Sequence, residues 1–250
     1  MSDLVEQRRE GAVVSLILAR PEKKNALTGA MYEALCAAFA EAGKDDSVGA
    51  ILMSGKGGVF TAGNDLGDFL AFAASDEPFP ATRFVQALAT CQKPLVAAIE
   101  GPAVGIGTTL CFHCDLVYAA PSARFQMPFV NLGLVPEAGS SLLAPLRFGM
   151  AKASEFLLLG EAFDAAEASR LGLVNAVVEA EGLYAHALAK AQALAAKPRA
   201  ALMATRKLLR GDPALLQARI AEENRAFTEA LRSPEARAAF SAFLQKSKAS

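Results

Sequence analysis

The stretch FTAGNDLGDF, Phe60–Phe69, connects a predicted strand to a predicted helix through small residues. It follows an apolar run, Gly49–Met53, and a glycine-rich turn with the sequence SGKGG. A second stretch, EGPAVGIGTT at Glu100–Thr109, has the same order of strand, glycine turn and helix start. This repeated alternation of strand and helix predicts an α/β fold with parallel strand pairing.

Both turns present backbone N–H groups, rather than reactive side chains, to a ligand. The first N–H groups of a helix have no intrahelical acceptor and lie at the positive end of the helix dipole. Small residues let a ligand come close to them. One such turn is usually only a turn, but two together could direct two N–H groups at one oxygen atom, which is an oxyanion hole without side chains.

Apolar periodicity predicts further elements on both sides of these turns. The predicted strands cover residues 13–18, 48–55 and 94–100, the predicted amphipathic helix covers 28–43 with Thr28 as its N-cap, and an irregular insert covers 74–83. These elements continue the α/β pattern to about residue 120.

The pattern becomes almost wholly helical beyond Glu137, with one short strand predicted within residues 173–178. No low-complexity linker separates the two halves of the chain. We therefore expect one catalytic core, residues 1–195, followed by a helical region, residues 196–250, that covers the active site or contacts a neighbouring subunit.

Composition narrows the classes of function. The chain has 250 residues, 53% of them hydrophobic, and a formal net charge of −1. Such a chain has no basic surplus for nucleic acid, although a local basic patch could hold one phosphorylated ligand. The sequence contains neither an unbroken apolar run of about 20 residues nor a secretory signal, so we expect a cytoplasmic protein without a membrane span.

The four cysteines do not predict a disulfide framework or a metal site. Cys111 and Cys114 form a CxxC pair, but no second ligand pair completes a zinc site. We expect these thiols to pack in the core.

Five motifs carry a resemblance to a known family. They are ARPEKKNALT, VFTAGNDL, GPAVGIGTTLCFHCDLVYA, LGLVPEAGSS and ASRLGLVNAVV. Their order and spacing resemble those of the enoyl-CoA hydratase/isomerase (crotonase) superfamily over essentially the whole chain. The resemblance implies a spiral of repeated ββα units with a helical C-terminal part, assembled as a homotrimer or dimer of trimers. It also implies an acyl-CoA thioester substrate and no separate cofactor, because coenzyme A enters as part of the substrate.

The same resemblance assigns roles by position. The oxyanion amides would belong to Asn64 and Ile106, and the isoleucine side chain would crowd the acyl pocket. We expect Asp65 to act mainly as a helix cap. The residues expected along the coenzyme A path are Lys24, Ala26, Ala62, Gly63, Asn64, Asp65 and Leu66.

The catalytic acids distinguish branches of the family. Hydratases in the family carry glutamates at the positions of Thr109 and Phe129, so simple hydration is disfavoured here. Glu137 remains, in LGLVPEAGSS, where Pro136 is expected to open the next helix. This arrangement resembles the Δ3,Δ2-enoyl-CoA isomerases, in which one glutamate at this position is the base. One carboxylate between C2 and C4 can remove a proton from the first carbon and deliver it to the second.

Three interpretations stay open at this point. The first is an isomerase that uses Glu137, and the second is another crotonase-type reaction of the kind named enoyl-CoA hydratase. The third is a non-catalytic acyl-CoA-binding trimer, in which Glu137 is only a favourable first-turn acid. Several aromatic residues could line an acyl tunnel or simply fill the core: Phe69, Phe72, Phe79, Phe84 and Phe129.

Overall fold

The computed structural model describes residues 4–73 and 79–249. It contains a six-stranded sheet in the order β1-β2-β3-β4-β6-β9 and a three-stranded sheet in the order β5-β7-β8. The strands are β1 (Val5–Glu10), β2 (Val13–Leu18), β3 (Ala50–Gly55), β4 (Leu95–Ile99), β5 (Pro102–Val104), β6 (Leu116–Ala119), β7 (Arg124–Gln126), β8 (Phe163–Asp164) and β9 (Ala176–Val177).

The large sheet confirms the predicted α/β pattern. Strands β2, β3, β4, β6 and β9 pair in parallel, and only β1 joins the sheet as an antiparallel neighbour of β2. Every residue of β2 and β4 is buried, which explains their predominantly apolar sequences. Strand β1, which is largely polar and lies at the sheet edge, was not predicted, nor were the short strands β5, β7 and β8.

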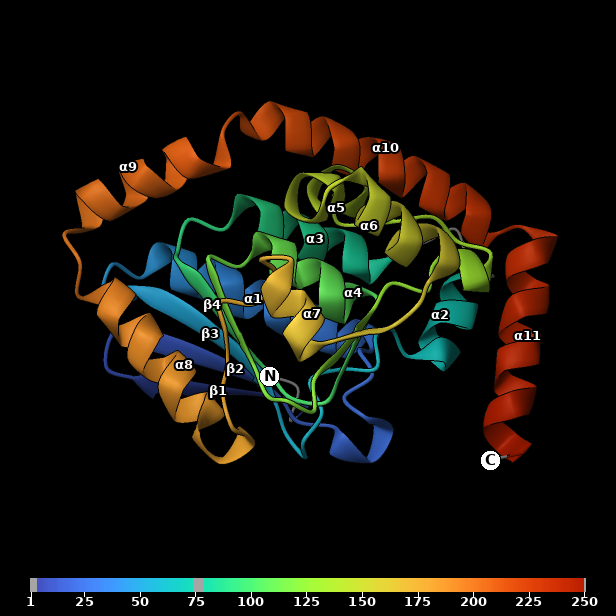
Figure 1. The fold of residues 1–250 in the computed structure, drawn as a ribbon, viewed down its shortest axis with the longest axis horizontal. Coiled ribbons are helices and arrows are strands. Elements are labelled where there is room, and N and C mark those ends of the chain that lie inside the picture. The colour runs from blue at the N-terminus through green and yellow to red at the C-terminus, as the bar shows by residue number, and fades with distance from the viewer. Residues whose placement is uncertain (1–3, 74–78, 250) are drawn as a thin grey trace.

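Helices cover both faces of the large sheet (Figure 1). Helix α8 packs on one face of β2, β3 and β4, while α1 packs against β1, β2 and α3. The helices are α1 (Gly29–Lys44), α2 (Leu66–Ala73), α3 (Pro80–Thr90), α4 (Ile106–Thr109), α5 (Ser140–Phe148), α6 (Met150–Ser154), α7 (Ala165–Arg170), α8 (Ala180–Ala195), α9 (Arg199–Arg210), α10 (Pro213–Leu231) and α11 (Pro234–Ala249). Four short turns of helix are η1 (Pro21–Lys23), η2 (Leu110–His113), η3 (Val130–Leu132) and η4 (Glu155–Leu159).

Local signals in the sequence account for several boundaries. The Thr28 side chain accepts a hydrogen bond from the Met31 N–H and caps α1, as predicted. Helix α3 begins at Pro80, inside the segment expected to be irregular, because proline fits the first helical turn. Residues 74–78 of that predicted insert lie outside the described residues.

The C-terminal helices lie along the outside of the molecule. In Figure 1, α9 and α10 run across the top and α11 descends beside α2. Helix α10 packs on α5 and α3, and Arg206 of α9 forms an ion pair with Asp115 at 2.8 Å. Arg206 also donates to the Cys91 carbonyl at 2.7 Å and is 8% exposed. These contacts fix the path of the C-terminal region over the core.

The two glycine turns are joined to each other through their backbones. Thr61 N–H donates to the Pro102 carbonyl at 2.9 Å, and Val104 N–H donates to the Thr61 carbonyl at 3.0 Å. Gly101, at φ +61°, permits this approach, since a Cβ atom there would overlap the Gly58 carbonyl oxygen.

Replacing Gly101 with alanine should therefore destabilise the fold strongly. Gly11→Ala is the matched control, because Gly11 has φ +65° and a Cβ atom added there would have no other atom within 4 Å. Both changes place an alanine in a left-handed conformation, which lowers the free energy of unfolding by about 1 kcal/mol. Gly101→Ala should lower it by about 1–3 kcal/mol more, because its Cβ atom overpacks against Gly58. Urea unfolding measures the difference, and equal losses for the two variants would contradict this account.

Candidate active site

The backbone around Asn64 is held by a parallel bridge to Leu27. Leu27 N–H donates to the Gly63 carbonyl at 2.8 Å, and Asp65 N–H donates to the Leu27 carbonyl at 2.9 Å. In a parallel bridge the intervening residue directs its own N–H to the opposite side. The Asn64 N–H is therefore turned away from Leu27.

Ile106 is the first residue of α4, so its N–H has no acceptor within the helix. In the described part of the chain, neither this N–H nor that of Asn64 donates a hydrogen bond. A bridge between Thr61 and Ala103 places the two turns beside each other. The arrangement has the features of a two-amide anion site.

The Ile106 side chain does not behave as the resemblance suggested. It is 1% exposed, packs within the main hydrophobic core, and lines neither of the two cavities described below. The prediction that it crowds the acyl pocket is wrong, because the helix directs it inward, away from the ligand side of the turn.

A groove of about 1060 Å³ passes the Asn64 turn. The segment at Lys24 lies beside this turn, since Ala62 N–H donates to the Lys24 carbonyl at 2.9 Å. Exposed basic side chains at Lys23, Lys24 and Arg124 line the groove. It brings together every residue expected along the coenzyme A path: Lys24, Ala26, Ala62, Gly63, Asn64, Asp65 and Leu66.

Asp65 has a structural role in the groove wall. Its Oδ1 accepts hydrogen bonds from the Gly67 and Asp68 N–H groups, so it caps α2 as expected. Its Oδ2 pairs with Arg20 at 2.7 Å. Burial opposes ionisation of Asp65, but the hydrogen bond and charge of Arg20, with the two amides, lower its pKa overall.

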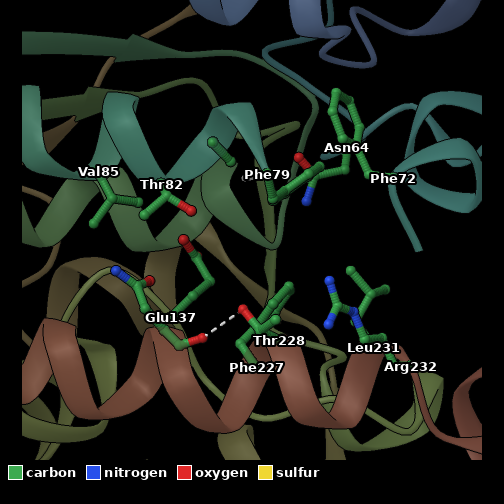
Figure 2. A pocket seen from close by; sticks show the side chains of 12 residues that line it. Asn64, Phe72, Phe79, Thr82, Val85, Glu137, Phe227, Thr228, Leu231 and Arg232 are labelled. Carbon is green, nitrogen blue, oxygen red and sulfur yellow. Dashed lines mark hydrogen bonds between the residues drawn. The ribbon is translucent and has the colours of Figure 1, made fainter. Parts of the chain in front are cut away.

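A smaller cavity, of about 140 Å³, opens on the other side of Asn64 between α3 and α10 (Figure 2). Asn64 and Phe227 line both spaces, which places the Asn64 turn between them. In Figure 2 the Glu137 side chain projects into this cavity from the side of α10, toward α3. The lining residues are Asn64, Phe72, Phe79, Ala81, Thr82, Val85, Glu137, Asn224, Phe227, Thr228, Leu231 and Arg232.

Glu137 is 8% exposed, and its Oε1 accepts a hydrogen bond from the Thr109 hydroxyl at 2.5 Å. Burial raises the pKa of Glu137 to about 8; the Thr109 hydrogen bond opposes this rise, and the negative charge of Glu223 adds to it. A carboxyl group with such a pKa can both accept and return a proton near neutral pH.

The backbone at Glu137 differs from the predicted helix start. Helix α5 begins at Ser140, and Ala138 and Gly139 have φ values of 58° and 72°. Pro136 and Glu137 therefore lie in a loop, and the prediction that Glu137 opens the helix is wrong. Two left-handed residues interrupt the helical geometry, so the dipole of α5 does not determine the pKa of Glu137 as a first-turn position would.

Several side chains hold this loop in place. The Ser140 hydroxyl donates to the Glu137 carbonyl at 2.6 Å, and His113 Nε2 lies 2.7 Å from the Ala138 carbonyl oxygen. Burial lowers the pKa of His113 to about 4. The imidazole is therefore neutral at pH 7 and contributes a hydrogen bond without adding a charge.

Thr109 and Phe129 occupy the positions of the hydratase acids. Thr109 contacts Glu137 directly, whereas Phe129 is 5% exposed and lines the groove. Among the other aromatic residues, Phe69 lines the groove, Phe72 and Phe79 line the small cavity, and Phe84 is fully buried core. The expectation of an aromatic-lined pocket thus applies to some of these residues but not to Phe84.

Two features of the site were not predicted from the sequence. Tyr32 of α1 donates a hydrogen bond from its hydroxyl to Asn64 Oδ1. Asn224, Thr228 and Arg232 form a polar face of the cavity at intervals of four residues along and just beyond α10. Their i, i+4, i+8 spacing is visible in the sequence, but nothing in it indicates which α10 face meets Glu137.

The comparison with protein families tests the resemblance that the five motifs carry. The family model described as enoyl-CoA hydratase/isomerase matches residues 8–250. The chain belongs to this family. Its fold is therefore of the crotonase type, as the motifs predicted.

The chain is similar to proteins named as isomerases and to proteins named as hydratases. Enoyl-CoA delta isomerase 2 of Rattus norvegicus is 41% identical over 67% of this chain, which spans 44% of the rat protein's length. A probable enoyl-CoA hydratase of Rhodobacter capsulatus is 37% identical over 95% of this chain and 93% of its own length. OdaA of Pseudomonas aeruginosa has a similar structure, with a TM-score of 0.93 and 45% identity over 97% of this chain and 99% of its own.

Membrane-spanning helices and clustered metal ligands are both absent from the described residues. No helix within residues 4–73 and 79–249 combines the length and apolar character needed to cross a bilayer. In the same ranges, no three His, Cys, Asp or Glu side chains form a group suited to a metal ion. Cys111 and Cys114 are buried, and their thiols donate to backbone carbonyls of Gly107 and Leu110.

The raised pKa of Glu137 predicts a measurable pH dependence of stability. The folded protein holds a proton at Glu137 up to about pH 8, whereas the unfolded chain releases it near the ordinary value of 4.5. The stability associated with this proton is complete below about pH 4.5 and is lost as the pH rises to about 8. Glu137→Gln cannot titrate, so its stability relative to wild type should rise over this window and then level.

Urea unfolding across the window measures this relative stability. Glu181→Gln, at an exposed position in α8, is the matched control and should follow the wild type at every pH. A difference between Glu137→Gln and wild type that stays constant with pH would show that Glu137 ionises normally.

Proposed function

We propose that the protein is a Δ3-to-Δ2-enoyl-CoA isomerase with Glu137 as its catalytic base. The observation that carries this proposal is a buried carboxyl group in a cavity beside the Asn64 amide. Among the described residues that line the cavity, Glu137 is the one carboxylic acid. Its pKa of about 8 suits proton transfer in both directions.

The reaction needs one proton to move and no atom to be added. The ionised Glu137 carboxylate removes a proton from C2 of the 3-enoyl-CoA, and the C–H electrons form a dienolate with negative charge on the thioester oxygen. The protonated Glu137 then delivers that proton to C4. The double bond shifts from C3–C4 to C2–C3, and the carboxylate is restored.

The amides of Asn64 and Ile106 stabilise the thioester oxygen while it carries this charge. Both N–H groups come from adjacent turns and donate no hydrogen bond within the described residues. Removing one such donor typically slows a reaction by about 10²–10³-fold. The site therefore needs no cofactor beyond the substrate's own coenzyme A.

The large groove suits the coenzyme A portion of the substrate. Lys23, Lys24 and Arg124 line it and can meet phosphate groups, and the Ala62–Leu66 backbone forms its wall. The acyl portion would pass Asn64 into the smaller cavity, where Glu137 lies. The two cavities thus separate recognition of the carrier from chemistry on the acyl chain.

Hydration is the second candidate function, because the R. capsulatus relative is named a probable enoyl-CoA hydratase. It is less well supported here. Thr109 donates its hydroxyl to Glu137, and Phe129 is an apolar residue in the groove wall. Neither supplies a second carboxylate to activate water. A non-catalytic acyl-CoA carrier would have no need to keep an acid buried at the cost in stability described above.

Glu137→Gln should reduce isomerisation of 3-hexenoyl-CoA by about 10²–10⁴-fold, because the amide keeps the shape of the side chain but cannot accept the proton. In the wild type, kcat/KM should rise with pH and level above about pH 8, where Glu137 is ionised. Absorbance of the conjugated 2-enoyl thioester measures both.

The exposed Glu181→Gln variant should keep wild-type activity in this assay. Crotonyl-CoA should not be hydrated at an enzymatic rate. Efficient hydration by the wild type, or full isomerase activity in Glu137→Gln, would refute the proposed function.

Asn64→Ala and Asn64→Pro separate the backbone from the side chain of Asn64. Alanine leaves the Tyr32 hydroxyl without its Asn64 acceptor. Because alanine keeps the backbone N–H, the Asn64→Ala variant should keep most of the activity. Proline deletes the donor and should reduce kcat by about 10²-fold or more. Circular dichroism verifies folding of both variants, and an inactive but folded Asn64→Ala would assign the role to the side chain.

We also propose a homotrimer or dimer of trimers. Large apolar side chains exposed on α5, α6, η4, α9 and α10 support an association surface. They are Leu146, Met150, Leu158, Leu159, Leu208, Leu209 and Leu215. Light scattering at micromolar concentration should give a mass three or six times that of one chain, and a monomer would contradict the proposal.

A further inference from the structure

Glu223 of α10 contacts the loop that carries Glu137. One carboxylate oxygen accepts from Gly139 N–H at 2.5 Å, and the other accepts from Ser141 N–H at 2.9 Å and the Ser141 hydroxyl at 2.6 Å. Glu223 is 5% exposed, so these three bonds form away from bulk water. They connect Glu223 to Gly139, two residues after Glu137, and to Ser141, the second residue of α5.

The loop has a conformation that needs such a partner. Ala138 and Gly139 are both left-handed, and alanine is unfavourable in this conformation. The turn directs the Gly139 and Ser141 N–H groups to one side, where a carboxylate can accept from both. Without an acceptor, the buried Gly139 N–H and the partly buried Ser141 N–H would favour another loop geometry.

We propose that Glu223 is a positioning residue for catalysis: through the 138–141 loop it fixes the Glu137 carboxyl beside Asn64 and places a second negative charge near the base. This inference rests on the proposed isomerase function. It gives the C-terminal region a defined part in the chemistry, because α10 holds the loop on which the base is carried.

Other charged and titratable groups also face this region. Tyr32 of α1 interacts electrostatically with Glu137, Arg232 lines the same cavity after α10, and His113 of η2 contacts the Ala138 carbonyl. Burial raises the pKa of Glu223, while the hydrogen bonds from Ser141 and Gly139 and the charge of Arg219 of α10 oppose this rise. Glu223 is the acidic neighbour whose charge raises the pKa of Glu137.

Two substitutions separate charge from position. Glu223→Gln removes the charge and one hydrogen-bond acceptor, so the pH midpoint of kcat/KM should shift to lower pH and kcat should fall by about 10²-fold. Glu223→Asp keeps the charge but withdraws it by one methylene, so kcat should fall while the midpoint stays closer to wild type. KM for 3-hexenoyl-CoA should change less than kcat in both, since the coenzyme A groove lies elsewhere.

Glu222→Gln is the matched control, because Glu222 is the exposed neighbour in α10 and should leave kcat and the pH midpoint unchanged. A folded Glu223→Gln with the wild-type pH midpoint and kcat would overturn the proposal. A second readout is independent of turnover. The stability difference between the protein with Glu137 and the Glu137→Gln variant is measured against pH by unfolding, first with Glu223 present and then in the Glu223→Gln background. The second series should give a lower pKa for Glu137 than the first.

This second readout distinguishes the two failures. If the wild type does not isomerise 3-enoyl-CoA but the unfolding profiles still shift, the proposed function fails and the coupling between the two carboxyl groups stands. If the wild type isomerises 3-enoyl-CoA normally, and Glu223→Gln shifts neither the pH profile of kcat/KM nor that of unfolding, the proposed role of Glu223 fails and the proposed function stands.

Discussion

The burial of the Glu137 carboxyl group is the constraint on which the rest of the site depends. A buried, unpaired charge is strongly unfavourable, so the group keeps its proton to about pH 8, and its Oε1 accepts a short hydrogen bond from the Thr109 hydroxyl. The same burial that weakens the folded state makes the group a suitable base. Ser140, His113 and Glu223 then hold the loop so that this reactive group lies beside the Asn64 turn.

The fold brings this acid and the two amides together from distant parts of the chain. Parallel strands β3 and β4 end at the same edge of the sheet, so the turns that follow them meet and pair through Thr61 and Ala103. Glycine at position 101 permits the close approach. Helix α10 completes the cavity from the other side, which makes the C-terminal helices part of the site rather than only a cover (Figure 2).

Much of this was accessible from the sequence, where local chemistry determines structure. The buried strands, the Thr28 cap and the two glycine turns follow from periodicity and small residues, and the motifs identified Glu137. Contacts between distant residues were not accessible. Glu223 reads as one more acid on an exposed helix until α10 is placed on α5, and the left-handed Ala138 that keeps Glu137 out of the helix has no sequence signal, since alanine normally favours helix.

The central claim is that one buried carboxyl group moves the proton from C2 to C4. Its most direct test is the fate of deuterium in 3-hexenoyl-CoA labelled at C2, followed by mass spectrometry and NMR of the 2-enoyl product. The account predicts that part of the label appears at C4, because Glu137, which is 8% exposed, holds the removed deuteron with little contact to bulk water. A product whose new C4 hydrogen comes wholly from solvent would contradict it, because a single base that holds the deuteron away from bulk water must pass part of the label to C4.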